Sequence, residues 1–157
     1  MKQSWQDVLD KFHYGIYLIT ISADGGHNGM VASWVTQCSH EPPLVAVAVR
    51  NNRLSRSQVL SAGKFTINVL PQDALVLIKR FKIPDWKKKF DGVEFGVSPH
   101  GNPVLVSALG YLDCEVERAL DTGDHTLFIS RIRAGELQRE GEPLTAEEYG
   151  DVYRGEK

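Results

Sequence analysis

The sequence has little of several features that would set it apart from an ordinary globular domain. It contains two cysteines, Cys38 and Cys114, and two thiols so far apart make neither a disulfide framework nor a zinc site. One long-range disulfide is left open, but a reducing compartment is the expectation. No apolar run approaches the ~20 residues of a membrane-spanning helix, and residues 1–10 lack the apolar centre of a signal peptide. We therefore expect a cytoplasmic protein that does not enter the membrane.

An excess of charge is also missing. The chain carries 18 basic and 20 acidic residues, which leaves a formal net charge of −2. This balance creates no strong field that would attract nucleic acid or an anionic membrane by charge alone. The length of 157 residues and the hydrophobic content of 42% predict a single globular domain over residues 1–157, without repeats or linkers.

The common motifs of nucleotide, hydrolase and metal sites are absent as well. No G-x-G-x-x-G turn follows a strand, and there is neither a P-loop nor a G-x-S-x-G elbow. The five histidines show no paired ligand spacing, and Cys38 and His40 lack two further ligands. The sequence therefore predicts neither a Rossmann dinucleotide site nor a metal site.

What the sequence does contain is the pattern of a mainly β protein with short helices. Strands are expected at residues 16–21, 30–39, 44–49, 65–70, 109–119 and 125–134. Helices are expected from Ser4 to Gly15, from Ser55 to Gly63, from Pro71 to Phe81 and after Thr145, with Ser4–Asp7 and Ser55–Gln58 as capping boxes. At least six strands with short connections favour a closed or nearly closed β-barrel with helices outside it.

The expected strand at 30–39 has an unusual composition. It combines small polar side chains with an indole and carries no charge; the residues are Ala32, Ser33, Trp34, Thr36, Gln37, Cys38 and Ser39. Such a mixture is typical of a wall that donates hydrogen bonds to a bound molecule. A half-buried strand whose hydroxyls satisfy backbone groups is the alternative interpretation.

A candidate anion site follows the next strand. Arg53, Leu54 and Ser55 lie where a helix is expected to begin, and free backbone N–H groups at a helix N-terminus favour phosphate. Arg53 adds the donors of its guanidinium. The alternative is an ordinary helix cap beside a solvated arginine. The lysines at 87–89 form a charge run, which is usually a solvated loop, but beside an anionic ligand they would supply a phosphate contact.

Five sequence blocks follow one another along the chain. They read N-G-M at 28–30, S-H-E-P-P-L at 39–44, G-K-F-T-I-N-V-L at 63–70, G-N-P-V-L at 101–105 with L-D-C at 112–114, and G-D-H-T-L-F-I at 123–129. In this order they resemble the signature of the flavin reductase-like family of FMN-binding split-barrel proteins, over about residues 12–144. The chain looks most like the flavin reductase domains that accompany rubredoxins or flavodiiron proteins. Because no rubredoxin cysteines follow, such a partner would be a separate chain.

The resemblance implies a fold and a cofactor site. The fold would be a six-stranded antiparallel split β-barrel of the Greek-key type, with short flanking α-helices, in a homodimer that binds FMN near the subunit interface. Cofactor-binding residues implied by the resemblance are Asn28, the 32–39 strand along the isoalloxazine ring and ribityl chain (Ala32, Ser33, Trp34, Thr36, Gln37, Cys38 and Ser39), and the phosphate-binding turn of Arg53, Leu54 and Ser55. Lys89 would add a phosphate contact.

Two residues keep a second interpretation, and one departure from the family pattern bears on the cofactor. Trp34 would lie near the flavin ring or pack in the core. His125 corresponds to a histidine that the family places near the flavin and the nicotinamide; it is our catalytic candidate, and the alternative is that it orients Asp124 and the turn. The segment at 33–35 is bulkier than the small-residue run usual in the family, which leaves the ring pose open and FAD as the alternative to FMN.

The function implied is that of an NAD(P)H:flavin oxidoreductase, an enzyme that transfers a hydride from NADH or NADPH to the flavin. Its electrons would go to a redox partner such as a rubredoxin, a flavodiiron protein or a monooxygenase. The first alternative is an electron carrier with bound FMN that another redox protein reduces. The second is a split-barrel binding module with no redox role. The sequence does not decide between NADH and NADPH.

Overall fold

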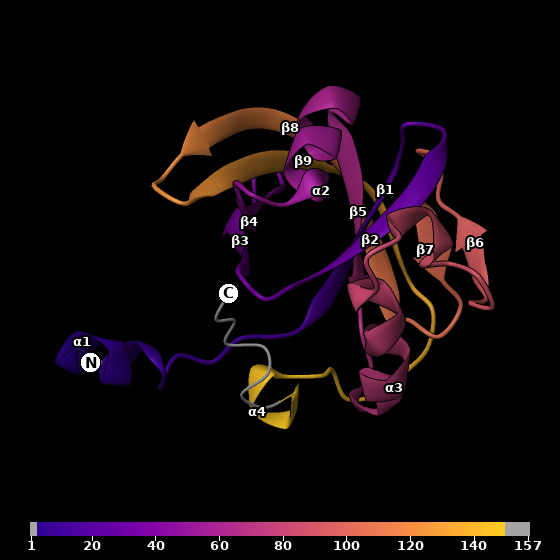
Figure 1. The fold of residues 1–157 in the computed structure, drawn as a ribbon. Helices are drawn as coiled ribbons and strands as arrows, with labels where there is room; N and C mark the ends of the chain where they lie inside the picture. Colours follow the sequence, from indigo (N-terminus) through magenta and orange to yellow (C-terminus); the bar gives the residue numbers. More distant parts are fainter. Residues whose placement is uncertain (1–2, 150–157) are drawn as a thin grey trace.

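The structure is a computed structural model that describes residues 3–149, without the side chain of Glu148. Its centre is an antiparallel sheet of seven strands in the order β2-β1-β5-β8-β9-β4-β3, beside a two-stranded ribbon of β6 and β7 (Figure 1). The strands are β1 (Tyr17–Ala23), β2 (Gly26–Ala32), β3 (Val35–Ser39), β4 (Leu44–Arg50), β5 (Lys64–Val69), β6 (Phe95–Val97), β7 (Pro103–Leu105), β8 (Gly110–Asp121) and β9 (His125–Leu137). The ribbon strands, of three residues each, are too short for a periodic pattern and were not expected.

The main core lies against β4 and β9. In their register Val47 faces Phe128 and Val49 faces Thr126. The apolar run of β4 predicted a strand buried on both faces, and successive residues Val45, Ala46 and Val47 are indeed all buried. Burial of such branched side chains contributes roughly 1.5–3 kcal/mol each. The core cluster consists of Ile19, Ile21, Ala32, Val45, Val47, Val49, Val59, Phe65, Ile67, Cys114 and Phe128.

The expectation of a six-stranded split barrel that is closed or nearly closed is wrong in two respects. The main sheet has seven strands, because the run at 30–39 is not one strand: it divides at Ser33 and Trp34 into β2 and β3. These two strands lie at opposite edges of the sheet, so within residues 3–149 the strand order does not close on itself. A composition pattern cannot reveal that a chain leaves one sheet edge and joins the other. The mainly β class and the antiparallel pairing are confirmed.

The helices begin at positions different from those expected. α1 (Ser4–Leu9) is capped by Gln3 together with Gln6 and ends well before Gly15, so the Ser4–Asp7 capping box is wrong. α2 (Leu54–Ala62) has Arg53 as its N-cap, which places Ser55 inside the first turn. The C-terminus of α2 is as expected. Gly63 adopts φ 72°, a left-handed conformation that glycine reaches without steric penalty.

The expected helix at 71–81 is broken into three short pieces. They are η1 (Gln72–Ala74), α3 (Leu75–Ile78) and η2 (Lys79–Lys82), followed by η3 (Trp86–Lys88). Ala74, Ile78 and Phe81 are buried in a second apolar cluster as predicted, whereas Leu75 is exposed. The last helix, α4 (Ala146–Tyr149), follows Thr145 as expected. None of the helices within residues 3–149 is long and apolar enough to cross a membrane.

A buried carboxylate joins the loop at 98–103 to the sheet. Asp113 on β8 is fully buried, and its Oδ1 accepts a hydrogen bond of 2.5 Å from the Thr66 hydroxyl of β5. Its Oδ2 accepts a bond of 3.0 Å from the backbone N–H of His100. Asn102, also buried, donates to the same Thr66 hydroxyl at 3.1 Å. These bonds satisfy polar atoms whose burial would otherwise be penalised, and they tie the 98–103 loop to β5 and β8.

Candidate functional site

The crossing between β2 and β3 carries the first group of candidate residues. Ser33 is buried, and its hydroxyl has no hydrogen-bond partner among the described residues. Trp34 is half-exposed, and its carbonyl accepts a bond of 3.0 Å from the Ala48 N–H of β4. An unsatisfied buried hydroxyl is uncommon in native proteins. A ligand that hydrogen-bonds to Ser33 would satisfy it.

His125 lies directly against this crossing. Its ring stacks on the Trp34 indole with the centroids 4.5 Å apart and the planes at 29°. Its Nδ1 lies 2.6 Å from Oδ1 of the exposed Asp124. That hydrogen bond, together with the charge of His125, lowers the pKa of Asp124 below its ordinary value. The imidazole is therefore held on one face by an indole and at one edge by a carboxylate.

The N-terminus of α2 carries the second group. Arg53 and Leu54 are exposed, whereas Ser55 is buried. The Ser55 hydroxyl contacts Sδ of Met30 on β2 at 3.0 Å, so it does not cap the helix as the sequence suggested. The contact fixes the first turn of α2 beside β2. The first backbone N–H groups of a helix have no intrahelical acceptor, which leaves donors for an anion at this turn.

Lys89 and Arg53 converge at this helix terminus. The Lys89 ammonium donates a hydrogen bond of 2.8 Å to the carbonyl of Gly29. Burial and, to a smaller extent, the nearby charge of Arg53 together lower the pKa of Lys89 to about 8. A partly buried lysine and an exposed arginine that repel each other are both stabilised by an anion between them. The pair is therefore a candidate for binding an anion.

Asn28 has a structural role in this arrangement. Its side-chain amide donates to Gln58 of α2 at 2.8 Å, and its carbonyl oxygen accepts from the Gly29 N–H at 2.8 Å. Gln58 in turn donates to Asp24 at 3.1 Å. Asn28 is buried and orients Gly29, whose carbonyl binds Lys89. Both functional ends of the Asn28 amide thus already have protein partners.

The remaining candidates lie on β3. Thr36, Gln37 and Cys38 are exposed and Ser39 is half-buried. β3 is the last strand of the sheet, so its outer edge has no strand partner within residues 3–149. An edge strand presents free backbone N–H and C=O groups, which are the groups that a flat heterocycle would need. Ala32, by contrast, is buried in the core cluster. Cys38 and Cys114 are both free thiols, so the long-range disulfide left open by the sequence is not formed.

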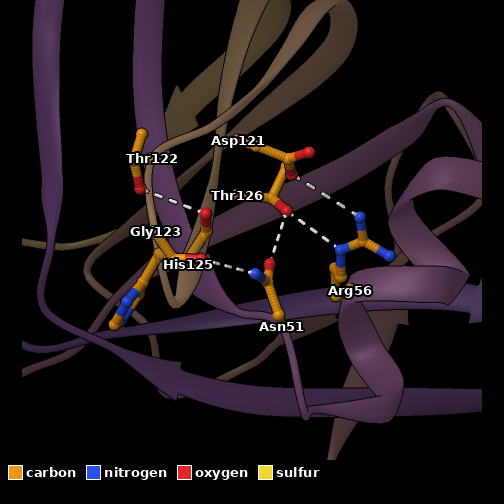
Figure 2. Close-up of polar contacts among 7 residues, drawn as sticks. All are labelled: Asn51, Arg56, Asp121, Thr122, Gly123, His125 and Thr126. Atoms are coloured by element: carbon orange, nitrogen blue, oxygen red, sulfur yellow. Dashed lines mark hydrogen bonds and ion pairs between the residues drawn. The ribbon is translucent and has the colours of Figure 1, made fainter.

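Sequence reasoning missed a polar network at the turn between β8 and β9 (Figure 2). It contains Asn51 and Arg56 from the β4–α2 region and Asp121, Thr122, Gly123 and Thr126 from the turn. Thr126 donates to Asn51 Oδ1 at 2.7 Å and accepts from Arg56 Nε at 2.9 Å. Arg56 also lies 3.8 Å from Asp121. The usable signal was modest: an asparagine after a buried strand is typical of a turn.

The described residues therefore bring the candidates together in two groups. Trp34 and His125 touch each other, while Arg53, Ser55 and Lys89 surround the start of α2. The network of Figure 2 connects the two groups, because Asn51 lies in the short connection that leads to Arg53. Among residues 3–149 no cluster of three or more His, Cys, Asp or Glu side chains is placed to hold a metal ion.

Comparison with known proteins identifies the family. Residues 9–154 match the family model described as the flavin reductase like domain. The chain is 32% identical over 154 residues to a flavin reductase of Pseudomonas putida, a match that covers 98% of this chain and 89% of that protein. The chain therefore belongs to the flavin reductase-like family, and the resemblance of the five sequence blocks is confirmed.

Two further similarities extend this result. The chain is 32% identical over 151 residues, or 94% of its length, to the high molecular weight rubredoxin of Moorella thermoacetica, of which it spans 66%. Among solved structures, the NADH:FAD oxidoreductase SgcE6 of Streptomyces globisporus superposes with a TM-score of 0.81 at 25% identity, over 90% of this chain and 87% of that chain. The seven-stranded arrangement is thus the fold of flavin reductases.

Proposed function

We propose that the protein is an NAD(P)H:flavin oxidoreductase whose single domain binds FMN. The convergence of Arg53 and Lys89 at the N-terminus of α2 is the observation that carries the proposal, because it supplies the charge and the donors for a flavin phosphate. The orphan hydroxyl of Ser33 and the free edge of β3 support a ring bound along the crossing. When bound, the flavin accepts a hydride at N5 from reduced nicotinamide.

In this proposal each protein group has a limited task. Arg53, Lys89 and the first turn of α2 bind the phosphate. Backbone groups of β3 and the Ser33 hydroxyl orient the ring and exclude water from one of its faces. His125 is held by Asp124 and Trp34, and we assign it to the border of the nicotinamide position. A hydride transfer needs two aligned rings more than a strong side-chain base, and the site supplies positioning.

Anaerobic mixing with reduced nicotinamide tests the function. The FMN-loaded protein is mixed with NADH and separately with NADPH while the absorbance of oxidised flavin is followed. Rapid bleaching is expected with at least one donor, and the faster one is the preferred substrate. A bound flavin that stays oxidised with both donors would contradict the reductase and favour the electron carrier. If neither FMN nor FAD binds, the binding-module alternative is favoured. If FAD binds more tightly than FMN, FAD is the cofactor in place of FMN.

We further propose a homodimer, supported by the exposed face of α1. This six-residue helix stands apart from the body of the sheet (Figure 1), and isolated helices of that length are not stable in water. Its apolar side chains are strongly exposed, with Trp5 at 58%, Val8 at 62% and Leu9 at 43%, and so is Phe12, which follows the helix, at 55%. A second copy of the chain would cover them reciprocally. Light scattering after gel filtration is expected to give a dimer that Trp5→Ser with Val8→Ser converts to monomer; an unaffected dimer would exclude α1 from the interface.

The electron acceptor is proposed to be a redox protein such as a rubredoxin, a flavodiiron protein or a monooxygenase, in the cytoplasm. Similarity to the Moorella high molecular weight rubredoxin supports a rubredoxin in particular, since part of that protein lies outside the matched region. With NADH and catalytic FMN, reduction of added rubredoxin is expected to outpace the rate that free reduced FMN gives alone. Equal rates would mean that the flavin is released before the acceptor is reduced.

A further inference from the structure

We propose that Asn51 is a positioning residue that sets His125 relative to the phosphate-binding turn. The inference rests on the proposed function, because it concerns how two parts of the flavin site are held at a fixed distance from each other. These parts are the Trp34–His125 stack and the phosphate-binding turn. Asn51 is the first residue after β4 and lies two positions before Arg53, the N-cap of α2. In Figure 2 the side chain of Asn51 does not meet the imidazole of His125, so its effect on His125 would pass through the backbone of the turn.

Three hydrogen bonds connect Asn51 to the residues on both sides of His125. Its backbone N–H donates to the carbonyl of Asp124 at 2.9 Å. Its side-chain amide donates to the carbonyl of Gly123 at 3.1 Å, and its side-chain oxygen accepts from the Thr126 hydroxyl at 2.7 Å. One exposed asparagine therefore binds the two residues before His125 and the one after it.

Strand pairing reaches the ends of the turn, where Asp121 pairs with Thr126 and Arg50 pairs with His125, but the residues between them lie outside the sheet. Residues 121–124 are exposed, and Gly123 adopts φ 143°, a conformation that side chains other than glycine rarely reach. Exposed hairpin tips are ordinarily mobile. Within the turn, Thr122 binds the carbonyl of His125 through its own N–H and its hydroxyl at 3.0 Å and 3.1 Å. Asn51 adds hydrogen bonds that fix the position of this turn relative to β4 and α2.

Arg56 extends the connection to the helix that carries the anion site. Its Nε donates to the same Thr126 hydroxyl at 2.9 Å, so that hydroxyl is bound from both sides. Figure 2 shows Asn51 and Arg56 flanking Thr126 while the imidazole of His125 points away from the network. This geometry holds the backbone of His125 and leaves its ring for the site. A displacement of about 1 Å in such a group lowers the rate of a positioned reaction by roughly a hundredfold.

The first test is a double-mutant cycle between Asn51→Ala and His125→Ala, read as the limiting rate of flavin reduction. Asn51→Ala removes the two side-chain bonds and keeps the backbone bond. We expect the rate to fall roughly tenfold to a hundredfold, while the Kd for FMN stays within about twofold because Arg53 and Lys89 are intact. In the His125→Ala background the same change should have little further effect. An equal fall in both backgrounds would overturn the proposal, since Asn51 would then act without His125.

Thr126 offers a matched pair of variants that does not alter Asn51 itself. Thr126→Val removes the donor to Asn51 and keeps the shape of the side chain, whereas Thr126→Ser keeps the hydroxyl. The rate should fall in the valine variant and be restored in the serine variant. If valine and serine give the same rate, the hydroxyl bond has no positioning role and the proposal fails.

A fluorescence measurement tests the role of Asn51 without depending on flavin reduction by nicotinamide. Because Trp34 stacks on His125, protonation of the imidazole should quench the indole, and a Trp34→Phe variant identifies this share of the fluorescence among the three tryptophans. Asn51→Ala should reduce the pH-dependent quenching, with or without nicotinamide. An unchanged titration would contradict the positioning role. If neither NADH nor NADPH reduces the wild-type flavin, the reductase proposal fails, while the titration still decides on Asn51.

Discussion

The rings of Trp34 and His125 are stacked with their centroids 4.5 Å apart, although the two residues belong to distant parts of the chain. Trp34 lies between the two edge strands, and His125 begins β9. Their contact joins two features that the sequence analysis had singled out separately. One is the 30–39 segment with its unusual composition, and the other is the histidine of the G-D-H block. Five predictions follow from this contact, from the cations at the start of α2 and from the buried carboxylate of β8.

His125→Ala is expected to lower the limiting rate of flavin reduction by roughly tenfold or more, with a much smaller effect on the Kd for FMN. The physical reason is that in the proposed site His125 borders the stacked rings, whereas the cations proposed to bind the phosphate, Arg53 and Lys89, lie just before α2 and just after η3. Stopped-flow reduction and fluorescence titration with FMN measure the two quantities separately. Equal reduction rates in the variant and the parent would remove His125 from the mechanism.

Trp34→Ala should disturb the same step through loss of the stack. The indole supports one face of the imidazole, and stacked aromatic pairs contribute about 0.5–1.5 kcal/mol. We expect a reduction rate that falls by about threefold to tenfold, and partial recovery in Trp34→Phe, which retains a ring. Stopped-flow measurements on both variants decide the matter. A phenylalanine variant no better than alanine would mean that ring stacking is not what Trp34 supplies.

Arg53→Ala combined with Ser55→Ala should weaken FMN binding by roughly tenfold to a hundredfold. The arginine supplies charge to the phosphate, and the serine holds the first turn of α2 against Met30 at 3.0 Å. The fold should persist, because Arg53 is exposed and the serine is a small side chain. Isothermal titration with FMN, compared with riboflavin as a ligand without phosphate, gives the test. Riboflavin affinity should be unchanged, and a variant that binds FMN as tightly as the parent would place the phosphate elsewhere.

FMN affinity should fall as the pH rises through about 8. The pKa of Lys89 in the folded protein is lowered from 10.5 to about 8, so the ammonium begins to lose its proton there, well below the pKa of an unfolded lysine. The neutral amine no longer attracts phosphate. Above this pH the Kd for FMN should increase in the parent, while Lys89→Arg, which stays charged, should show a flat profile. The same slope in both proteins would separate Lys89 from the phosphate.

Asp113→Ala should destabilise the fold by about 2–4 kcal/mol. The substitution leaves the Thr66 hydroxyl and the His100 N–H without their buried acceptor. Urea unfolding monitored by circular dichroism measures the change. Asp85→Ala provides a surface control: its ion pair with Lys88 at 3.9 Å is exposed on both sides, and such pairs contribute about 0–1 kcal/mol. Similar losses in the two variants would contradict the role assigned to Asp113.

Much of the strand pattern could be read from the sequence because it depends on local chemistry. The apolar run of β4 and the glycine after α2 have physical causes that act within a few residues, and both were predicted correctly. The failure at 30–39 has a different origin. Whether a chain turns at Ser33 and changes sheet edge depends on contacts with strands far away in sequence, such as the bond from Ala48 to the Trp34 carbonyl.

The candidate site divides in the same way. Arg53 and Ser55 could be named because helix N-termini have a recognisable composition. The role of Asn28 as an anchor for Gly29 could not be predicted, because it depends on a hydrogen bond to Gln58. The sequence analysis had assigned the Gln58 side chain to a capping box with Ser55. Asn51 went unnoticed because Arg50–Arg53 reads as an ordinary polar loop. Its three bonds to the β8–β9 turn arise only once the strands have paired.

The outer edge of β3, which has no strand partner within residues 3–149, has a consequence for the tendency of the protein to aggregate. An uncovered strand edge is a template on which other chains can pair, and a molecule that occupies it stabilises the native state by mass action. A flavin bound along β3 would thus prevent self-association through this edge. We expect flavin-stripped preparations to form particles on storage that flavin-saturated ones do not.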